Sequence, residues 1–190
     1  YRPNPGALHS KGAMGLDGLI VTTEDTLRRS SDVTDEVCVE GASADIEGAV
    51  YWGLSAILLG LSRAAFERSV RYVAERTQFG RALSDFQAIQ WMIADSDAEL
   101  DALEMVVGQA ALTADIQSAV EAAVIAVDVS RAVTDRALQM HGGYGFTKEY
   151  QVERHWRNAR YIGDVLLGGG LALKSRLGRV KVEGCLESSE

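Results

Sequence analysis

The sequence predicts an all-α fold, in which an up-and-down four-helix bundle follows a short β or irregular segment. Apolar residues recur every three to four positions in three long stretches that start at about residue 46, and this spacing places them on one face of a helix. Few residues separate the stretches, so successive helices should run antiparallel. The sequence contains no internal repeat and no low-complexity tract that would favour another architecture.

The first part of the chain differs from the rest. Residues 1–46 hold both prolines and two β-favouring pieces, 19–23 and 37–39, so we expect short strands and loops there. This segment is too small to bury a core alone. We expect one helical domain over 47–180 and a flexible tail over 181–190.

The helix boundaries are predicted from start and stop signals. The first helix should run from about residue 46 to Glu75. Ser84–Gln87 and Ser118–Glu121 have the spacing of capping boxes, whose side chains bond the free amides of a helix start. Paired glycines should end the third helix at Gly142. Two shorter helices should follow, over about 148–157 and 161–178. Six apolar residues should face one core: Ile57, Leu61, Ile93, Leu100, Val127 and Val133.

The composition excludes several functional classes. The 190 residues are 47% hydrophobic and 24% charged, with a formal net charge of −8, so the chain should bind neither nucleic acid nor an anionic membrane. The apolar run 54–61 is too short for a membrane span, and we find no signal peptide. The two cysteines lack metal-ligand spacing, so we expect no metal site and a reduced, cytoplasmic setting.

Two segments around the end of the first helix carry groups suited to a ligand. Arg76-Thr-Gln-Phe-Gly80 offers an arginine for charge-assisted hydrogen bonds to a phosphate and a glycine for a sharp turn. Phe86-Gln87 stands at the start of the next helix, where a glutamine can bond a polar ligand. The plainer interpretations are a helix C-terminus and a helix cap.

Two later segments complete the set. In Gln139-Met-His-Gly-Gly-Tyr-Gly-Phe146, the glycines allow a phosphate or a ring to approach the backbone, although a helix stop with a structural His141 is the plainer interpretation. Val152–Arg160 has acidic and basic residues at helical spacing. We interpret most of these as ion pairs on a charged helix that faces solvent or an interface.

In their order and spacing, these four segments together resemble the C-terminal half of the acyl-CoA dehydrogenase family. The resemblance covers about residues 47–162. Residues 1–46 are more loosely similar to the end of the family's middle β-domain, chiefly through Lys11-Gly-Ala-Met-Gly-Leu16. The family's N-terminal helical domain and most of its β-domain have no counterpart in the sequence.

The resemblance implies a bundle that helps to bind FAD across a subunit interface, in a homo- or hetero-oligomer such as a dimer or tetramer. It also implies α,β-dehydrogenation of an acyl thioester, either acyl-CoA or carrier-bound, with hydride transfer to the flavin. In the family, the Arg–x–x–Phe–Gly segment and the later Phe–Gln contact a neighbour's flavin nucleotide, and the Gln–x–x–Gly–Gly loop lies near its adenosine end. The cofactor-binding residues implied are Arg76, Thr77, Gln78, Phe79, Phe86, Gln87, Gln139, Met140, His141, Gly142 and Gly143.

The resemblance fails at the catalytic base. The family's glutamate usually stands in a Tyr-Glu-Gly-Thr pattern just after the arginine-rich helix, and Tyr161-Ile-Gly-Asp164 occupies that place here, with Ile162 at the glutamate position. A smaller group of relatives places the glutamate where this chain has Val50. Neither side chain can accept a proton. The nearby carboxylates Glu47 and Asp164 are candidates for a relocated base, or serve only as a helix-start charge and a cap.

Three hypotheses follow for the function. The first is a component of a flavin-dependent acyl-thioester dehydrogenase. The second is a non-catalytic structural subunit that completes the FAD site of a partner dehydrogenase subunit. The third is a helical bundle with an unrelated ligand, which would bind no flavin.

Overall fold

The computed structural model describes residues 20–25, 35–40 and 44–187. The chain divides into two compact units, 1–47 and 48–190, which we describe separately. In the first unit, β1 (Ile20–Asp25) and β2 (Asp35–Glu40) pair antiparallel, with Ile20 opposite Glu40. The strands predicted at 19–23 and 37–39 are therefore confirmed within the described residues, whereas the Lys11–Leu16 stretch lies outside them.

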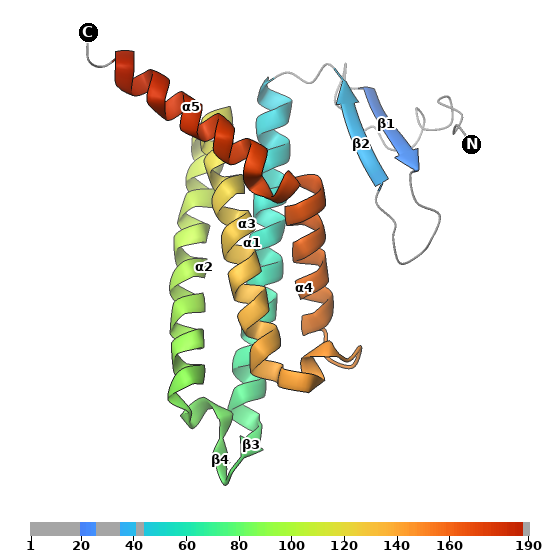
Figure 1. The fold of residues 1–190 in the computed structure, drawn as a ribbon, viewed down its shortest axis with the longest axis vertical. Coiled ribbons are helices and arrows are strands. Elements are labelled where there is room, and N and C mark those ends of the chain that lie inside the picture. Colours follow the sequence, from blue (N-terminus) through green and yellow to red (C-terminus); the bar gives the residue numbers. More distant parts are fainter. Residues whose placement is uncertain (1–19, 26–34, 41–43, 188–190) are drawn as a thin grey trace. The chain divides into compact units, whose positions relative to one another are not determined.

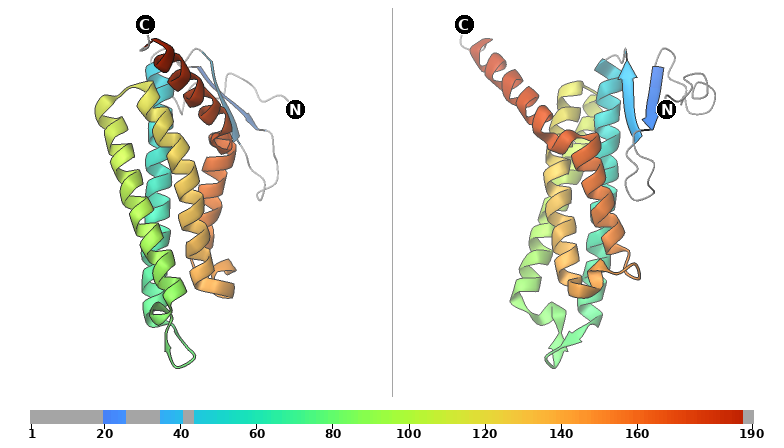
Figure 2. Two further views of the ribbon diagram at one scale, coloured as in Figure 1. Left: turned by 60° about the vertical axis from the view of Figure 1, so that its left-hand side comes forward. Right: turned by 45° about the vertical axis from the view of Figure 1, so that its right-hand side comes forward.

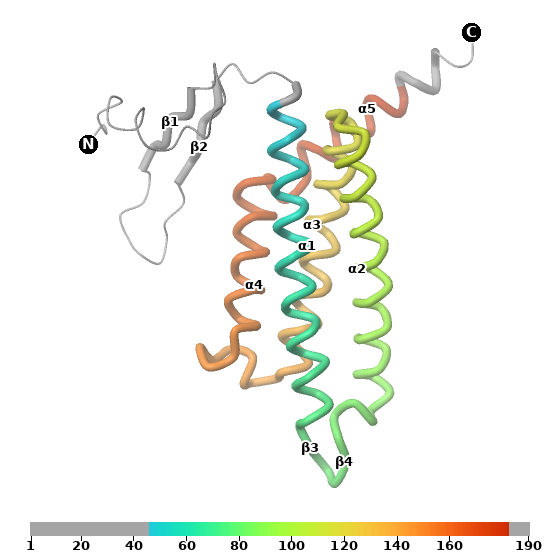
Figure 3. Tube along the Cα trace, turned by 180° about the vertical axis from the view of Figure 1, so that it is seen from behind, coloured from blue at the N-terminus to red at the C-terminus, as the bar shows by residue number. Residues whose placement is uncertain are grey.

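The second unit is a helical bundle, as the sequence predicts. Four helices lie side by side: α1 (Ala44–Glu75), α2 (Gln87–Thr113), α3 (Ile116–His141) and α4 (Val152–Arg160) (Figures 1 and 2). A fifth helix, α5 (Leu171–Glu187), crosses one end of the bundle obliquely. At the opposite end, a small hairpin joins α1 to α2, and the turn after α3 lies at that end too (Figure 3). The hairpin consists of β3 (Thr77–Gln78) and β4 (Arg81–Ala82).

Both predicted capping boxes are wrong. Ser84 belongs to a 3-10 turn, Leu83–Asp85, and α2 begins at Gln87 with no side-chain hydrogen bond at its N-cap. Helix α3 is capped by Asp115, whose carboxylate accepts a hydrogen bond from the Ser118 N–H at 2.8 Å. Backbone and hydroxyl hydrogen bonds from Ser118 lower the pKa of Asp115 to about 2. Asp115 does not fit the capping-box motif, because the residue three positions later is serine and not Glu or Gln. The motif therefore did not identify this cap.

The later helices also differ from the prediction. The single helix expected over 161–178 is divided into a π-helical turn, Tyr161–Leu166, a short turn at Gly168–Gly170, and α5. The three glycines of the short turn all have positive φ, which ends the regular helix there. Helix α5 then continues to Glu187, beyond residue 180, where we expected a flexible tail to start.

The core confirms three of the six predicted residues and corrects one. Leu100, Val127 and Val133 are buried, and Leu61 and Ile93 are half-buried. Ile57 is 50% exposed, so its predicted place in the core is wrong. Helix α1 instead turns a different face inward, which includes the fully buried side chains of Ser55, Leu58, Ser62, Ala65, Ser69 and Val73.

Buried serines explain the error at Ile57. The hydroxyls of Ser55, Ser62 and Ser69 each donate to the carbonyl one turn back, at 2.6 to 2.9 Å, so their polar groups are satisfied inside the core. Their small side chains sit seven residues apart. A pattern that counts only apolar residues assigns these positions to solvent. The inward face of the helix is then predicted at the wrong residues.

The apolar run 54–61 lies within α1, whose bounds agree with the helix predicted from about residue 46 to Glu75. Over Ile46–Glu75, α1 is the one described helix that is long and apolar enough to cross a membrane by length and composition. Core helices of globular proteins pass the same test. Leu58, Ala65 and Val73 of α1 are buried in the bundle, but only 22% of the most apolar window of this helix is buried, so packing within the described residues covers only part of its apolar surface.

Candidate functional site

The hairpin after α1 displays an aromatic side chain at its tip. Phe79 and Gly80 form the two-residue turn between β3 and β4, with φ of 53° and 81°. Positive φ at both positions suits a tight hairpin turn, yet it is unfavourable for phenylalanine and costs about 1 kcal/mol or more. The Phe79 side chain is 93% exposed, so it gains little from packing within the described residues. This combination indicates a contact with something outside the bundle.

The second predicted segment lies beside this hairpin. The Phe79 and Phe86 rings are edge to face, with centroids 6.5 Å apart, and the Arg81 guanidinium lies 3.9 Å from the centre of the Phe86 ring. Gln87 is the first residue of α2 and is exposed. The hairpin and the start of α2 therefore form one aromatic and cationic surface.

The glycine-rich segment turns the chain at the end of α3. Helix α3 ends at His141, as predicted, and Gly142 has a φ of 59°. The buried His141 ring stacks on Tyr72 at 4.3 Å, and its Nδ1–H donates to the Ala137 carbonyl at 2.8 Å. Burial lowers the pKa of His141, which keeps the ring neutral. The plainer, structural interpretation of this histidine fits these contacts.

A cleft brings the first and third predicted segments together. It has a volume of about 340 Å³ and lies between the end of α1 and the end of α3. Six of the predicted residues line it, and Tyr72, Leu83 and Ile89 complete it. The predicted residues that line the cleft are Arg76, Gln78, Gln139, Met140, His141 and Gly142.

The other predicted residues lie outside this cleft. Thr77 and Phe79 are exposed on the hairpin, and Phe86 and Gln87 lie at the start of α2. Sequence reasoning missed Tyr72, which stands one helical turn before Arg76 on the same face. The four-residue spacing between Tyr72 and Arg76 could have identified Tyr72 as a residue of the same site.

The donor groups of the cleft suit an anionic, planar ligand. The Arg76 guanidinium lies 5.4 Å from the centre of the Tyr144 ring and pairs with no carboxylate of the described residues. The side-chain amides of Gln78 and Gln139 add donors and acceptors. An alanine Cβ at Gly143 would meet no heavy atom within 4 Å, so the backbone there is open to close approach. One cation, two amides and an open glycine turn fit the phosphates and polar ring edges of a dinucleotide such as FAD.

The charged helix α4 behaves as interpreted from the sequence. Glu153 forms an ion pair with Arg157, and Arg160 pairs with Asp135 of α3 at 2.6 Å. His155 is buried and its Nε2 accepts a hydrogen bond from Arg68 at 3.2 Å. Burial, reinforced by the charges of the nearby Arg68 and Arg154, lowers the pKa of His155. The contacts of Arg160 with Asp135 and of His155 with Arg68 bind α4 to the bundle, whereas the Glu153–Arg157 pair lies within α4.

The two positions expected for a catalytic base carry apolar side chains, and these differ in their exposure to solvent. Ile162 is partly buried and packs against the core, so a carboxylate at 162 would lie beside apolar side chains. Val50 is 45% exposed on α1, one turn after Glu47. Asp164 is the only carboxylate in the segment 161–170, and it forms an ion pair with Arg131 of α3. The carboxylate nearest to the predicted base position is thus already engaged.

Comparison with known proteins agrees with this architecture. Residues 52–163 match the family model described as "Acyl-CoA dehydrogenase, C-terminal domain", so the chain belongs to the acyl-CoA dehydrogenase family. The match ends just before Asp164.

Individual relatives support the same assignment. The chain is 38% identical over 124 residues to a 3-sulfinopropanoyl-CoA desulfinase from Advenella mimigardefordensis, covering 63% of this chain and 30% of that protein. It is 41% identical over 113 residues to a short-chain-specific acyl-CoA dehydrogenase from Clostridium acetobutylicum, covering 57% of this chain and 30% of that protein. The butyryl-CoA dehydrogenase structure from Megasphaera elsdenii superposes with a TM-score of 0.71 at 27% identity, covering 89% of this chain and 50% of that one. The chain thus spans about a third of the length of these two relatives and half of this structure.

Proposed function

We propose that this chain supplies the FAD-binding helical bundle of a flavin-dependent oxidoreductase that acts on acyl thioesters. The observation that carries the proposal is the cleft in which Arg76, directly after α1, and Gln78 of β3 meet Gln139 and Gly142, at the end of α3. Segments more than 50 residues apart in sequence converge there with a donor set suited to a dinucleotide. Family membership supports the same cofactor.

The roles of the chain's own residues follow from their chemistry. Arg76 would neutralise a phosphate of the dinucleotide, and Gln78 and Gln139 would bond its polar edges. Phe79, exposed at the hairpin tip, would pack on a ring. When bound, the flavin would accept the hydride that leaves the β-carbon of the acyl thioester. Because Phe79 points away from the bundle's own core, we further propose that the cofactor is shared with a second subunit, of the same or another kind.

A second candidate function has an observation of its own. Val50 and Ile162 cannot take a proton, and Asp164 is paired with Arg131, so the chain offers no unengaged carboxylate at the expected base positions. This favours a non-catalytic subunit that completes the FAD site of a partner dehydrogenase. Four of the matched relatives are named for desulfination, so the named activities of the relatives are not limited to dehydrogenation. The cytoplasmic setting remains a prediction from cysteine usage.

Anaerobic reduction of the flavin distinguishes the two candidates. If the chain is catalytic, adding acyl-CoA to its complete flavoprotein should bleach the flavin absorbance, and either Glu47→Gln or Asp164→Asn should slow bleaching by about 10²-fold or more. If the chain is non-catalytic, flavin should bind, but neither substitution should change the bleaching rate. A complete protein without flavin would contradict both. Because Ile162 faces the core, a carboxylate should be introduced at the exposed Leu166 as well as at Ile162.

A further inference from the structure

A second cavity shares two residues with the cleft described above. It has a volume of about 420 Å³ and lies between the last two turns of α1 and the segment that leads into α4. Tyr72 and His141, whose rings stack with centroids 4.3 Å apart, line both cavities. The stacked pair is therefore the wall that the two cavities share. All other residues that line the second cavity are absent from the first, so it is a separate place for a ligand.

Two distant parts of the chain build this cavity. One face of α1 supplies four side chains at the spacing i, i+3, i+4 and i+7, namely Arg68, Arg71, Tyr72 and Glu75. The opposite side comes from residues 149–152, at the start of α4. The cavity thus depends on the packing of α4 against α1 and is not the end of a single helix.

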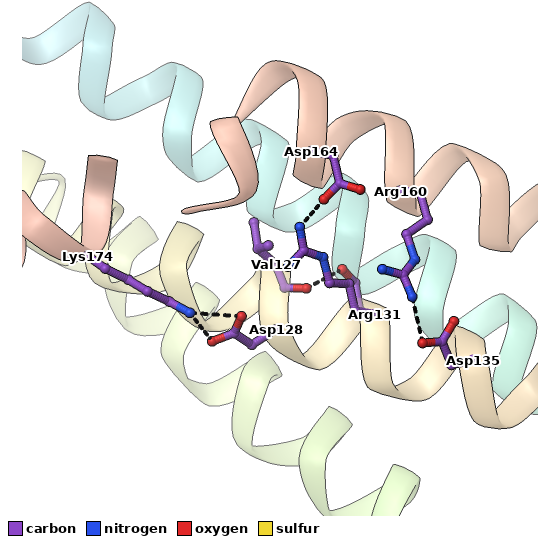
Figure 4. Close-up of polar contacts among 8 residues, drawn as sticks. Val127, Asp128, Arg131, Asp135, Arg160, Asp164 and Lys174 are labelled. Atoms are coloured by element: carbon purple, nitrogen blue, oxygen red, sulfur yellow. Dashed lines mark hydrogen bonds and ion pairs between the residues drawn. The ribbon is translucent and has the colours of Figure 1, made fainter. Parts of the chain in front are cut away.

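Arg71 lines the cavity without a partner of its own. Glu67 and Glu75 each stand one helical turn away, at a spacing that favours an ion pair. Arg71 nevertheless forms neither an ion pair nor a hydrogen bond with any residue that the structure describes. Elsewhere on the bundle, by contrast, Arg131 pairs with Asp164 (Figure 4). The guanidinium of Arg71 is therefore available to the anionic group of a ligand.

Arg68 is held beside Arg71 by a buried histidine. The Arg68 Nε–H donates to His155 Nε2 at 3.2 Å, and His155 is only 7% exposed. The two terminal nitrogens of Arg68 bond no side chain within the described ranges. A guanidinium that is already fixed at one nitrogen loses less conformational freedom when it binds a ligand. Arg68 and Arg71 together present two sets of free donors to one space, which suits a phosphate group.

Two carboxylates restrict the kind of anion that fits. Glu75 and Glu149 line the same cavity, and neither forms an ion pair with a described residue. A bare phosphate would be attracted by the arginines but repelled by these carboxylates. A ligand that also carries hydroxyl or amino donors would satisfy both kinds of group.

Aromatic rings supply the third element of the site. The rings of Tyr72 and Tyr150 are edge to face, with centroids 5.5 Å apart, and both residues line the cavity. Nucleic-acid bases stack on aromatic side chains of this kind. A nucleoside phosphate has all three matching parts: a phosphate, hydroxyl and amino donors, and a planar base. The cavity volume lies within the range of small-molecule sites.

We propose that this second cavity binds a nucleoside phosphate, with its phosphate at Arg68 and Arg71, its hydroxyl or amino donors at Glu75 and Glu149, and its base against Tyr150. The inference goes beyond the proposed function and does not rest on it, because neither arginine lines the cleft assigned to FAD.

Titration with ADP tests this site, in the complete protein saturated with FAD so that the first cleft is occupied. ADP should bind saturably, and Arg71→Gln should weaken its binding by about 10-fold or more, the effect of losing a charge-assisted hydrogen bond. The control Arg63→Gln, two turns earlier on α1 and outside the cavity, should bind ADP as the parent does. The proposal would be overturned by no saturable binding up to about 1 mM ADP, or by equal affinities of Arg71→Gln and the parent.

Two simpler probes test the nucleoside part. Pyrophosphate and adenosine each lack one half of the ligand, so each should bind at least about 10-fold more weakly than ADP. Glu149→Gln should weaken ADP but strengthen pyrophosphate, because it removes an acceptor from one and a repulsion from the other. Equal affinities for pyrophosphate and ADP would overturn the nucleoside assignment. A parent that binds no FAD would refute the proposed function, whereas the ADP titration of the flavin-free protein would still decide this inference.

Discussion

Two glycines in the turn after α3 should differ in how much stability the same substitution costs. In Gly145→Ala, the new Cβ would lie 2.9 Å from the His141 Cβ, 3.0 Å from the Leu138 carbonyl and 3.1 Å from a Leu138 methyl group. Both neighbours are buried, so the backbone or the core must shift. Overpacking of this kind costs about 1–3 kcal/mol, which for a chain of this size lowers the melting temperature by roughly 2–12 °C.

Gly143→Ala is the matched control. It lies in the same turn, Gly142–Phe146, but its Cβ would meet no heavy atom within 4 Å, so stability should change by about 0.5 kcal/mol or less. Thermal unfolding of both variants, followed by circular dichroism, measures the difference. Equal stability of Gly145→Ala and the parent, or equal loss in both variants, would refute the packing argument. Because the open space at Gly143 is also part of the proposed cofactor approach, Gly143→Ala should weaken flavin binding while Gly145→Ala lowers stability.

Three further substitutions test the fold. Leu100→Ala should cost about 2–5 kcal/mol in urea unfolding because the side chain is buried, whereas Met105→Ala on the exposed face of the same helix should cost about 0.5 kcal/mol or less. Asp115→Ala should lower stability at pH 7, and the gap from the parent should close as pH falls from about 4 to about 2, because the depressed pKa of Asp115 makes its stabilisation present above the unfolded value and lost on protonation. The lowered pKa of His141 predicts that the parent loses stability as pH falls below about 6.5, and that His141→Phe loses less; urea midpoints at pH 7.5 and 5.5 measure this.

Periodicity was sufficient to predict the helices but not their rotation or their exact starts. The apolar spacing located α1, α2 and α3, because long amphipathic helices repeat the same signal many times. Ile57 was misplaced because the serines on the inward face of α1 read as polar, although their hydroxyls are satisfied by the helix's own carbonyls. The π turn has no counterpart in the apolar spacing, whereas the helix break at Gly168–Gly170 could have been predicted by the glycine rule that located the end of α3.

The candidate site was predictable in part. Resemblance selected Arg76, Gln78 and the residues at the end of α3, and the fold brings these into one cleft. The exposed position of Phe79 at the hairpin tip depends on a positive φ at this residue. The sequence of the turn only suggests that φ. The family resemblance assigned Ile162 to the base position, yet its packing against the core and the pairing of Asp164 with Arg131 come from tertiary packing alone.

The affinity for FAD tests the central claim most directly. The complete protein, stripped of cofactor and titrated with FAD, should bind it, and Arg76→Gln should weaken binding by about 10- to 100-fold, the effect of losing one charge-assisted hydrogen bond to a phosphate. Arg63→Gln, within α1 and outside the cleft, should bind as the parent does. A parent that binds no FAD, or equal affinities for Arg76→Gln and Arg63→Gln, would contradict the assignment of this cleft as the cofactor site.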